Sequence, residues 1–306
     1  MTALATRGER YGSWEFEEGA ELAPGRTILR LLGGGSRYEA YLVWDERLFT
    51  MLVAKVLRPD QVEEERAIRD ITLEAEALER LQHPVLVRGF GAVLDGPHPH
   101  VAMEHLEGPT LRRLIKRGGP LLLPQLLPLA LNVAAAIHYM AQERMVHLDV
   151  KPENIVMGVP PRLIDLSVAR SFERAARLQG TVGTDAYMAP EQCDTDAFYG
   201  RIGPPADVWG LAATLHHAVS GAVPYPRPRN ARESDDRNVR FPQLHAERAP
   251  LPAGTPPELR ELLDAGMAMD PADRPTAAEF AMALEPLVAA MPRKVRATRG
   301  GLYFPR

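Results

Sequence analysis

The pattern of apolar and polar positions changes character about a third of the way along the chain. Up to residue 108, short apolar runs are interrupted by glycine, proline and charged residues, which predicts strands. The predicted strands cover 29–45 around a glycine turn, 51–57, 85–94 and 100–106. Segment 61–82 repeats its apolar residues at helical spacing, and we expect a helix that ends before His83-Pro84. The first part should therefore be a sheet with one helix.

Longer segments with helical spacing follow. They predict helices over 110–117, 124–142, 207–220, 258–268 and 276–290. A loop is expected over 167–191, and residues 224–257, rich in proline and arginine, are expected to be irregular surface structure. The predicted fold class is therefore α+β, with two lobes and a crevice between them. Its predicted parts are an N-terminal lead-in (1–26), a sheet lobe (27–103), a helical lobe (104–290) and a basic, flexible tail (291–306).

The composition narrows the class of protein without identifying it. With 306 residues, 45% hydrophobic residues and a net charge of −4, the chain is typical of a globular protein. Bulk charge gives no reason to expect binding to nucleic acid or to an anionic membrane. The single Cys193 excludes an internal disulfide and agrees with a reduced, cytoplasmic location, and the N-terminus lacks the apolar stretch of a signal peptide. Segment 121–141 is apolar, but its prolines and polar side chains favour a core helix over a membrane span.

Three features of the first part suggest a site for a phosphorylated ligand. Gly33, Gly34 and Gly35 lie between two predicted strands, where backbone N–H groups can approach a phosphate, although a plain turn explains them as well. Lys55 interrupts the apolar run MLVAKVL, so its ammonium group either meets an anion or lies in water on an edge strand. Glu74 shares the apolar face of the predicted helix and is the candidate partner of Lys55, the alternative being a solvated acid.

The segment HLDVKPEN carries the most specific candidate chemistry. Asp149 is placed to accept a proton from a hydroxyl nucleophile, and Lys151 can neutralise charge on a transferring phosphoryl group. Asn154, together with Asp165 after a short hairpin, supplies hard oxygen ligands for Mg²⁺. We expect His147 to be packed and structural.

In their order and spacing, these segments resemble the eukaryotic-type Ser/Thr protein kinases, and the style of the sequence is similar to kinases of high-GC bacteria. The resemblance covers about residues 27–290. It rests on LGGGSRYEA, VAKV, the helix with Glu74, VHLDVKPENIV, IDLS, GTDAYMAPEQ, DVWGLAATL and DPADRPTAAEF. It implies a two-lobed kinase fold and an enzyme that transfers the γ-phosphoryl group of ATP to Ser or Thr hydroxyls of proteins, with ATP and Mg²⁺ as cofactors.

The resemblance also implies a role for each candidate residue. Lys55 would hold the α- and β-phosphates, Glu74 would hold Lys55, and Asp149 would be the catalytic base with Lys151 assisting. Asn154 and Asp165 would bind Mg²⁺. The nucleotide pocket would further include Gly33, Gly34, Gly35, Ala40, Ala54, the gatekeeper Met103 and the hinge backbone from Glu104 to Leu106.

Other residues would have structural roles by the same resemblance. Glu191 and Arg274 would form a buried ion pair, and Asp207 would anchor the backbone of the catalytic loop. Thr184 would contact Asp149 and Lys151.

Three positions depart from the family pattern. Tyr38 replaces the third glycine of the glycine loop, which we expect to alter loop mobility and nucleotide affinity. Leu148 replaces an arginine that grips a phosphate on the activation loop, so we predict that loop phosphorylation is not needed for activity. Ser167 replaces a glycine whose backbone angles other residues resist. Because no predicted phosphate or metal contact is deleted, a working enzyme is favoured.

Two alternative functions stay open. A pseudokinase would use the same fold as an ATP-binding scaffold, and the three replaced positions would mark its lost turnover. A small-molecule phosphotransferase is disfavoured by Lys151 and by Ala189-Pro190-Glu191, which favour a protein substrate with Ser or Thr. Glu107 and Glu153 would favour basic residues near the target hydroxyl, the alternative being that both are solvated acids, which is the more common outcome. A regulatory protein partner could dock on the basic tail, whose alternative is a solvated end.

Overall fold

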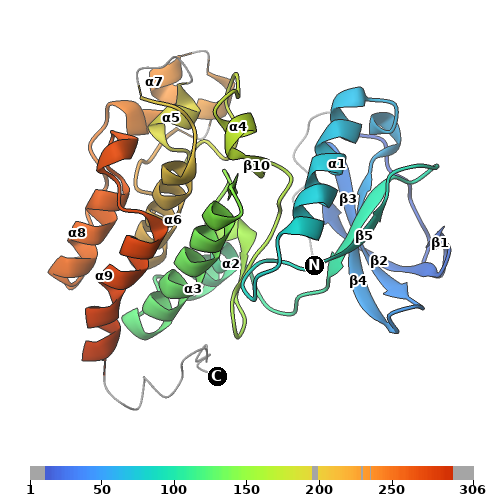
Figure 1. Cartoon of the computed structure of the whole chain (residues 1–306), viewed down its shortest axis with the longest axis horizontal. Helices are drawn as coiled ribbons and strands as arrows, with labels where there is room; N and C mark the ends of the chain where they lie inside the picture. The colour runs from blue at the N-terminus through green and yellow to red at the C-terminus, as the bar shows by residue number, and fades with distance from the viewer. Residues whose placement is uncertain (1–10, 195–198, 229, 235, 292–306) are drawn as a thin grey trace. The chain divides into compact units, whose positions relative to one another are not determined.

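The computed structural model describes residues 11–194, 199–228, 230–234 and 236–291. The described residues fall into two compact units, one coloured blue to teal and one coloured mainly green to red in Figure 1. The first unit holds the described residues up to Arg80 together with Arg88–His105. The second unit holds Leu81–Val87 and the described residues from Leu106 onward. The predicted basic tail, apart from Met291, lies outside the described residues.

The first unit is an antiparallel sheet with one long helix. Its elements are β1 (Glu21–Ala23), β2 (Arg26–Gly34), β3 (Tyr38–Asp45), β4 (Thr50–Leu57), the 3₁₀ turn η1 (Pro59–Gln61), α1 (Glu65–Arg80), β5 (Gly89–Val93) and β6 (His100–Glu104). The strands lie in the order β1-β2-β3-β4-β6-β5, and α1 packs against β5 and β6 (Figure 1). Every neighbouring pair is antiparallel, as expected for strands joined by short turns.

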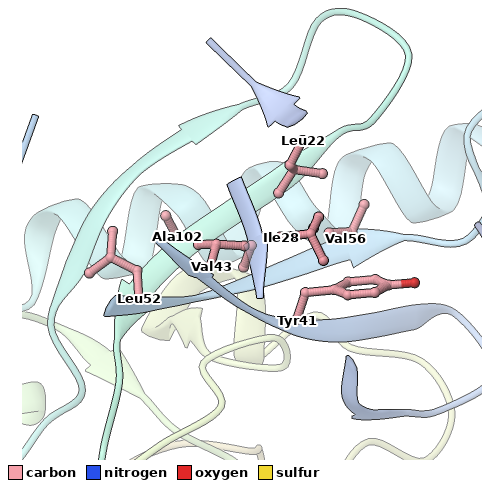
Figure 2. Packing of buried hydrophobic residues seen from close by; sticks show 8 residues of the cluster. Leu22, Ile28, Tyr41, Val43, Leu52, Val56 and Ala102 are labelled. Atoms are coloured by element: carbon pink, nitrogen blue, oxygen red, sulfur yellow. The ribbon is translucent and has the colours of Figure 1, made fainter. Parts of the chain in front are cut away.

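Strand β4 shows that the two faces of the sheet differ, because successive side chains of a strand point to opposite faces. Its residues Leu52, Ala54 and Val56 are buried, whereas Val53 and Lys55 between them are partly exposed. The buried face carries a core cluster made of Leu22, Ile28, Tyr41, Val43, Leu52, Ala54, Val56 and Ala102 (Figure 2). The sheet therefore has one sealed face and one face that can carry polar chemistry.

Residues 11–20, which precede the sheet, pack against it, whereas the sequence predicts a polar lead-in over 1–26. Trp14 and Phe16 pack against the core cluster, and the Trp14 Nε1–H donates to the Leu57 carbonyl at 2.7 Å. The buried Glu39 carboxylate accepts hydrogen bonds from the Ser13 hydroxyl at 2.6 Å and from the Trp14 N–H at 3.2 Å. Two aromatic residues set among charged neighbours thus cover the sealed face of the sheet.

The second unit is mainly helical. Its helices are α2 (Leu111–Gly118), α3 (Leu123–Gln142), α4 (Phe172–Ala175), α5 (Pro190–Cys193), α6 (Pro204–Ser220), α7 (Arg237–Arg240), α8 (Pro257–Gly266) and α9 (Ala277–Ala290). Its short strands pair as β7 (Met145–Val146) with β10 (Arg170–Ser171) and as β8 (Ile155–Val156) with β9 (Arg162–Leu163). Its 3₁₀ turns are η2 (Pro152–Asn154), η3 (Ala231–Glu233), η4 (Pro242–Leu244) and η5 (Pro271–Asp273).

The ends of these helices follow local sequence signals. At the start of α2, Thr110 Oγ1 accepts a hydrogen bond from the Arg113 N–H at 3.2 Å. Helix α9 begins with a capping box, in which Thr276 and Glu279 accept from each other's backbone N–H at 3.2 and 2.8 Å. Helix α6 stops at Gly221, whose φ of 79° is a left-handed conformation that glycine adopts without strain.

Helix α3 forms the centre of the second unit. It packs against α6 and α9, and its buried apolar residues include Leu126, Ala130 and Val133. In the part of the chain that the structure describes, α3 is also the one helix long and apolar enough to span a membrane, with a mean hydropathy of 1.2. Half of that stretch is buried inside the unit, which agrees with the prediction of a core helix.

The predicted α+β class, with an antiparallel sheet followed by helices, is confirmed. The long predicted helices are all present, with ends that differ by a few residues. The predicted strand over 85–94 is shorter, because only Gly89–Val93 pairs within the sheet. The described part of segment 224–257 is mostly irregular, as predicted, but it also forms η3, α7 and η4.

Candidate active site

Lys55 and Glu74 form an ion pair within the first unit. The Lys55 ammonium group donates to both carboxylate oxygens of Glu74 at 2.9 Å. Glu74 lies on the buried face of α1 with Ile71 and Leu78, so its side chain is only 1% exposed, whereas the Lys55 side chain is 16% exposed. A carboxylate buried in this way needs a cation. The predicted pairing therefore describes the structure, and neither a solvated Glu74 nor an edge-strand Lys55 does.

The strand register shows which predicted pocket residues share a face with Lys55. Ala40 on β3 and Val101 on β6 lie directly opposite Lys55, and Met103 lies opposite Val53. Ala40 and Met103 are therefore on the partly exposed face with Lys55. Ala54 is not on this face: one residue away from Lys55, it points to the sealed face and belongs to the core cluster. The residue of β4 beside Lys55 on the polar face is Val53, which corrects the prediction for Ala54.

Gly33 and Gly34 end β2, and Gly35 begins the tight turn that leads to β3. Gly33 has a φ of 148°, and a Cβ atom on Gly34 would lie 2.5 Å from the Tyr38 carbonyl oxygen, so a side chain fits poorly at either position. The Gly35 N–H donates to the Tyr38 carbonyl at 3.0 Å, and the Gly35 carbonyl accepts from Arg58 Nε at 2.7 Å. The Gly35 N–H, which was predicted to face a phosphate, is thus used inside the turn in this conformation.

Tyr38, which stands where the family has its third glycine, lies against the Lys55–Glu74 pair. The Lys55 Nζ atom is 4.7 Å from the centre of the Tyr38 ring, a cation–π distance. The Tyr38 hydroxyl is buried and has no hydrogen-bond partner among the described residues. Burial raises the pKa of this hydroxyl to about 12, although Lys55 acts in the opposite direction, so it stays protonated at neutral pH. The sequence showed this residue only as a departure and gave no sign of its contact with Lys55.

The catalytic loop of the second unit is held by Asp207 of α6. The carboxylate of Asp207 accepts from the backbone N–H groups of His147 and Leu148, each at 2.7 Å. Burial raises the pKa of Asp207, and the His147 ring and the two backbone donors oppose this rise. His147 is fully buried, with ring contacts to backbone atoms at 3.2 and 3.3 Å. The anchoring role predicted for Asp207 and the packed position predicted for His147 describe what the structure has.

Asp149, Lys151 and Asn154 meet at the end of this loop. Asp149 Oδ2 accepts from Lys151 Nζ at 2.6 Å and from Asn154 Nδ2 at 3.1 Å. The other oxygen, Asp149 Oδ1, is buried and accepts no hydrogen bond from any described residue. Lys151 Nζ also donates to Thr184 Oγ1 at 2.6 Å, so Thr184 contacts Lys151 as predicted. The carboxylate is thus fixed through one oxygen and has the other available to accept a proton.

Asn154 and Asp165 remain the candidates for holding Mg²⁺. The Asn154 amide nitrogen donates to both the carbonyl and the side chain of Asp149, which fixes the orientation of the amide. The Ile164 N–H donates to the Asn154 carbonyl at 2.8 Å and brings the backbone before Asp165 next to Asn154. Within the described ranges there is no cluster of three or more His, Cys, Asp or Glu side chains suited to a metal. An amide oxygen and a carboxylate fit Mg²⁺, which keeps water and phosphate as most of its ligands.

The Asp165-Leu166-Ser167 segment differs from its sequence-based interpretation in where the unusual backbone lies. Leu166 is fully buried, as expected for an apolar plug. The left-handed conformation falls on Asp165, with a φ of 67°, and not on Ser167. In this conformation, therefore, replacing glycine by Ser167 causes no backbone strain.

The predicted ion pair of Glu191 with Arg274 and the predicted hinge can both be located in the structure. Arg274 forms two hydrogen bonds with Glu191, at 2.7 and 2.9 Å, and both side chains are fully buried. Glu104 and Leu106, predicted as the hinge, lie on either side of the point where the chain passes from the first unit to the second. Glu104 is tied to its own unit, because its N–H donates to the Arg88 carbonyl and its carboxylate accepts from the Arg88 N–H, both at 2.9 Å.

The loop over 167–191 and helix α5, together called the activation segment below, make contacts that sequence reasoning missed. Gln192 Nε2 donates to the Leu148 carbonyl at 2.9 Å and to the Val182 carbonyl at 2.8 Å, which ties the segment to the catalytic loop. Asp185 is buried and pairs with two arginines from the proline- and arginine-rich segment. No local pattern announces the two pairs of Asp185, because their partners lie 42 and 55 residues away along the chain.

Comparison with known proteins adds an independent finding. Residues 26–283 match the protein kinase domain. The chain is similar to the serine/threonine-protein kinase PknD of Mycobacterium tuberculosis, with 31% identity over 265 residues, which is 84% of this chain and 38% of that protein. It is also similar to PknB of the same organism, with 27% identity over 266 residues, 82% of this chain and 41% of that protein. PknB of Mycobacterium leprae is 29% identical over 204 residues, 64% of this chain and 32% of that protein. The chain thus spans less than half the length of these relatives.

Proposed function

Because the chain belongs to the protein kinase family, we propose that it transfers the γ-phosphoryl group of ATP to Ser or Thr hydroxyls of proteins. The predicted kinship with bacterial Ser/Thr kinases of the eukaryotic type is confirmed by the mycobacterial relatives. The observation that carries the proposed activity is the geometry at Asp149. One carboxylate oxygen is fixed by Lys151 and Asn154, and the other is buried and accepts no hydrogen bond from any described residue.

Each residue would contribute by position and charge. Asp149 would accept the proton of the substrate hydroxyl at Oδ1. The hydrogen bond from Lys151 to Oδ2 already fixes the orientation of this carboxylate. Lys151 would neutralise charge on the phosphoryl group during transfer, and Thr184 would keep its ammonium group in place. Phosphoryl transfer needs little covalent help from a protein, so positioning and charge neutralisation would supply most of the rate enhancement.

Different residues would hold the nucleotide and the metal. Lys55, oriented by Glu74, would pair with the α- and β-phosphates. Asn154 and Asp165 would hold Mg²⁺, which neutralises phosphate charge when it is bound. Val53, Ala40 and Met103 share the face of Lys55 and would line the nucleotide site, with Val53 replacing the predicted Ala54.

We further propose that activity does not require phosphate on the activation loop. Leu148, which stands where the family has its phosphate-binding arginine, is apolar and only 3% exposed. A phosphate would therefore find no cation at that position. Treating the protein with a phosphatase should leave its activity unchanged, and loss of activity that returns with phosphate on Thr181 or Thr184 would contradict this.

The experiment that tests the proposed function is a measurement of intact protein mass after incubation with Mg²⁺ and ATP. Wild type should gain phosphate or transfer it to a general protein substrate, and Asp149→Asn, which keeps the shape of the side chain but cannot accept the proton, should not. ATP binding without any transfer by wild type would favour the pseudokinase alternative. Transfer to small hydroxyl compounds and not to proteins would favour the phosphotransferase alternative.

A further inference from the structure

Asp185 is a buried carboxylate that two arginines hold from a distant part of the chain. Arg227 Nη1 lies 2.8 Å and Arg240 Nε 3.2 Å from Asp185 Oδ2, and Arg240 Nη2 lies 3.3 Å from Oδ1. The Asp185 side chain is 5% exposed. Burial works to raise the pKa of Asp185, but the hydrogen bonds from Arg240 and Arg227 outweigh it and lower that pKa, so the carboxylate is ionised at neutral pH.

The backbone at Asp185 is fastened as well. Gln243 Nε2 of η4 donates to the Asp185 carbonyl at 2.7 Å and to the Met188 carbonyl at 3.2 Å. Asp185 directly follows Thr184, whose hydroxyl accepts from Lys151, and Lys151 in turn donates to Asp149. A continuous series of contacts therefore runs from the two arginines through Asp185, Thr184 and Lys151 to the Oδ2 atom of Asp149.

We propose that Asp185 is a positioning residue that holds the activation segment in its working conformation by means of a fixed carboxylate. This inference rests on the proposed kinase function and deepens it. Asp185 with Arg227 and Arg240 is called the carboxylate lock below. The carboxylate lock supplies an anion that guanidinium groups hold. Elsewhere in the family a phosphate on the activation loop would be this anion, whereas the carboxylate of Asp185 needs no covalent modification.

The location of the cations supports this role. Leu148 offers no charge at the catalytic loop, whereas Arg227 and Arg240 both pair with Asp185. Removing the carboxylate would leave two guanidinium groups facing each other without an anion. The segment from Val182 to Met188 should then loosen, and Thr184 should no longer hold Lys151 at a fixed distance from Asp149.

The test compares wild type, Asp185→Asn, Asp185→Glu and Arg240→Gln, all treated with phosphatase and checked by mass. Arg232→Gln is the matched control, because Arg232 lies between the two lock arginines in sequence, is exposed, and forms no ion pair with any described residue. Asp185→Asn and Arg240→Gln should lower kcat by about 10-fold or more, because small misplacements of catalytic groups are costly. KM for ATP should change by less than about 2-fold, because the lock touches no nucleotide residue. Asp185→Glu should restore part of kcat, and the control should match wild type.

A second measurement does not depend on catalysis. Amide hydrogen exchange over Val182–Met188 should become about 10-fold faster in Asp185→Asn, while exchange in α3 stays as in wild type. Wild-type kcat and wild-type exchange in Asp185→Asn would overturn the lock. It would also be overturned if dephosphorylated wild type were inactive and phosphate on Thr181, whose hydroxyl lies 3.4 Å from Arg240 Nη2, restored activity. Faster exchange in a protein that transfers no phosphate at all would support the lock and contradict the proposed function.

Discussion

Two ion pairs, one in each unit, join a glutamate to a basic side chain and serve different ends. In the second unit, Glu191 and Arg274 are both fully buried, and Arg274 also donates to backbone carbonyls and lies 5.0 Å from the Trp209 ring centre. In the first unit, Glu74 is buried, but Lys55 is 16% exposed. The sealed pair has every group satisfied inside the protein and can only hold structure. The accessible pair presents a positioned ammonium group that a ligand can reach.

The same substitution in both pairs gives the largest predicted effect. Glu191→Gln leaves Arg274 as an uncompensated cation out of reach of water and should lower the free energy of unfolding by about 3–5 kcal/mol. Glu74→Gln leaves Lys55, which can still reach water, and should cost about 1–2 kcal/mol. Urea unfolding followed by circular dichroism measures both. Equal midpoints for the two variants would contradict the distinction between a sealed and an accessible pair.

The loss of activity should be larger for the accessible pair than for the sealed pair, which is the reverse of the order in stability. Glu74→Gln removes the group that orients Lys55 and should lower kcat/KM by about 10- to 100-fold while the protein stays folded. Arg69→Gln is a suitable control, because Arg69 lies on the same helix and pairs only with the exposed Glu65 among the described residues. The comparison fails if Glu74→Gln keeps wild-type kcat/KM, since Lys55 would then need no partner.

A buried basic group with no acid partner among the described residues sharpens the comparison. His217 of α6 accepts from Arg112 Nη1 at 2.9 Å and contacts the Tyr187 hydroxyl at 2.6 Å. Burial, and secondarily the charges of Arg112 and His216, lower the pKa of His217 to about 4. Because its pKa is lower in the folded state, His217 remains neutral there while the unfolded chain takes up a proton below about pH 6.5. The stability it contributes is therefore present above that pH and is lost as pH falls towards 4.

This linkage can be measured by thermal unfolding at pH 7.5 and pH 5. His217 should account for about 1–2 kcal/mol of the loss between these values, and His217→Gln, which can still accept from Arg112, should reduce the loss by that amount. His245→Gln is the control, because His245 lies outside this cluster. An unchanged difference between the two pH values in His217→Gln would show that His217 is not neutral in the folded protein.

The smallest effect concerns Tyr38, which covers the accessible pair. Tyr38→Phe keeps the ring over Lys55 and removes a buried hydroxyl without a partner among the described residues, so stability should stay the same or rise by up to about 1 kcal/mol. Tyr38→Leu, which lacks the ring, should lose about 0.5–1 kcal/mol. The urea midpoints of the two variants test this, and a large loss in Tyr38→Phe would mean that the hydroxyl has a partner after all.

Sequence patterns predicted most of the fold and the core of the site because both are local in the chain. Helical spacing located α3, α6 and α9, and the spacing of Asp149, Lys151 and Asn154 within one short loop brings them together by itself. The pairing of Lys55 with Glu74 could be predicted because each stands out as a charge in an apolar pattern.

The parts that were missed depend on register or on distant partners. Ala54 and Val53 are both apolar, so only the strand ladder shows which one shares a face with Lys55. Asp185 looks like an ordinary loop residue, because Arg227 and Arg240 approach it from a segment that has almost no regular structure. Trp14 and Phe16 were assigned to a polar lead-in because each is surrounded by charged residues, which hides their packing from any average over a window.

The contacts of Glu39 bear on where the sheet unit begins, which sequence similarity alone would place at residue 26. Its carboxylate gathers Ser13, the Trp14 backbone, the Tyr41 hydroxyl at 3.0 Å and Arg58 at 3.1 Å around one buried point. The match to the kinase domain begins at residue 26, beyond two of these four partners. A shortened chain that starts at that border would keep every residue with a proposed role in catalysis and still expose the sealed face of the sheet. The region that matches the kinase domain and the packed unit that contains the sheet therefore start at different residues.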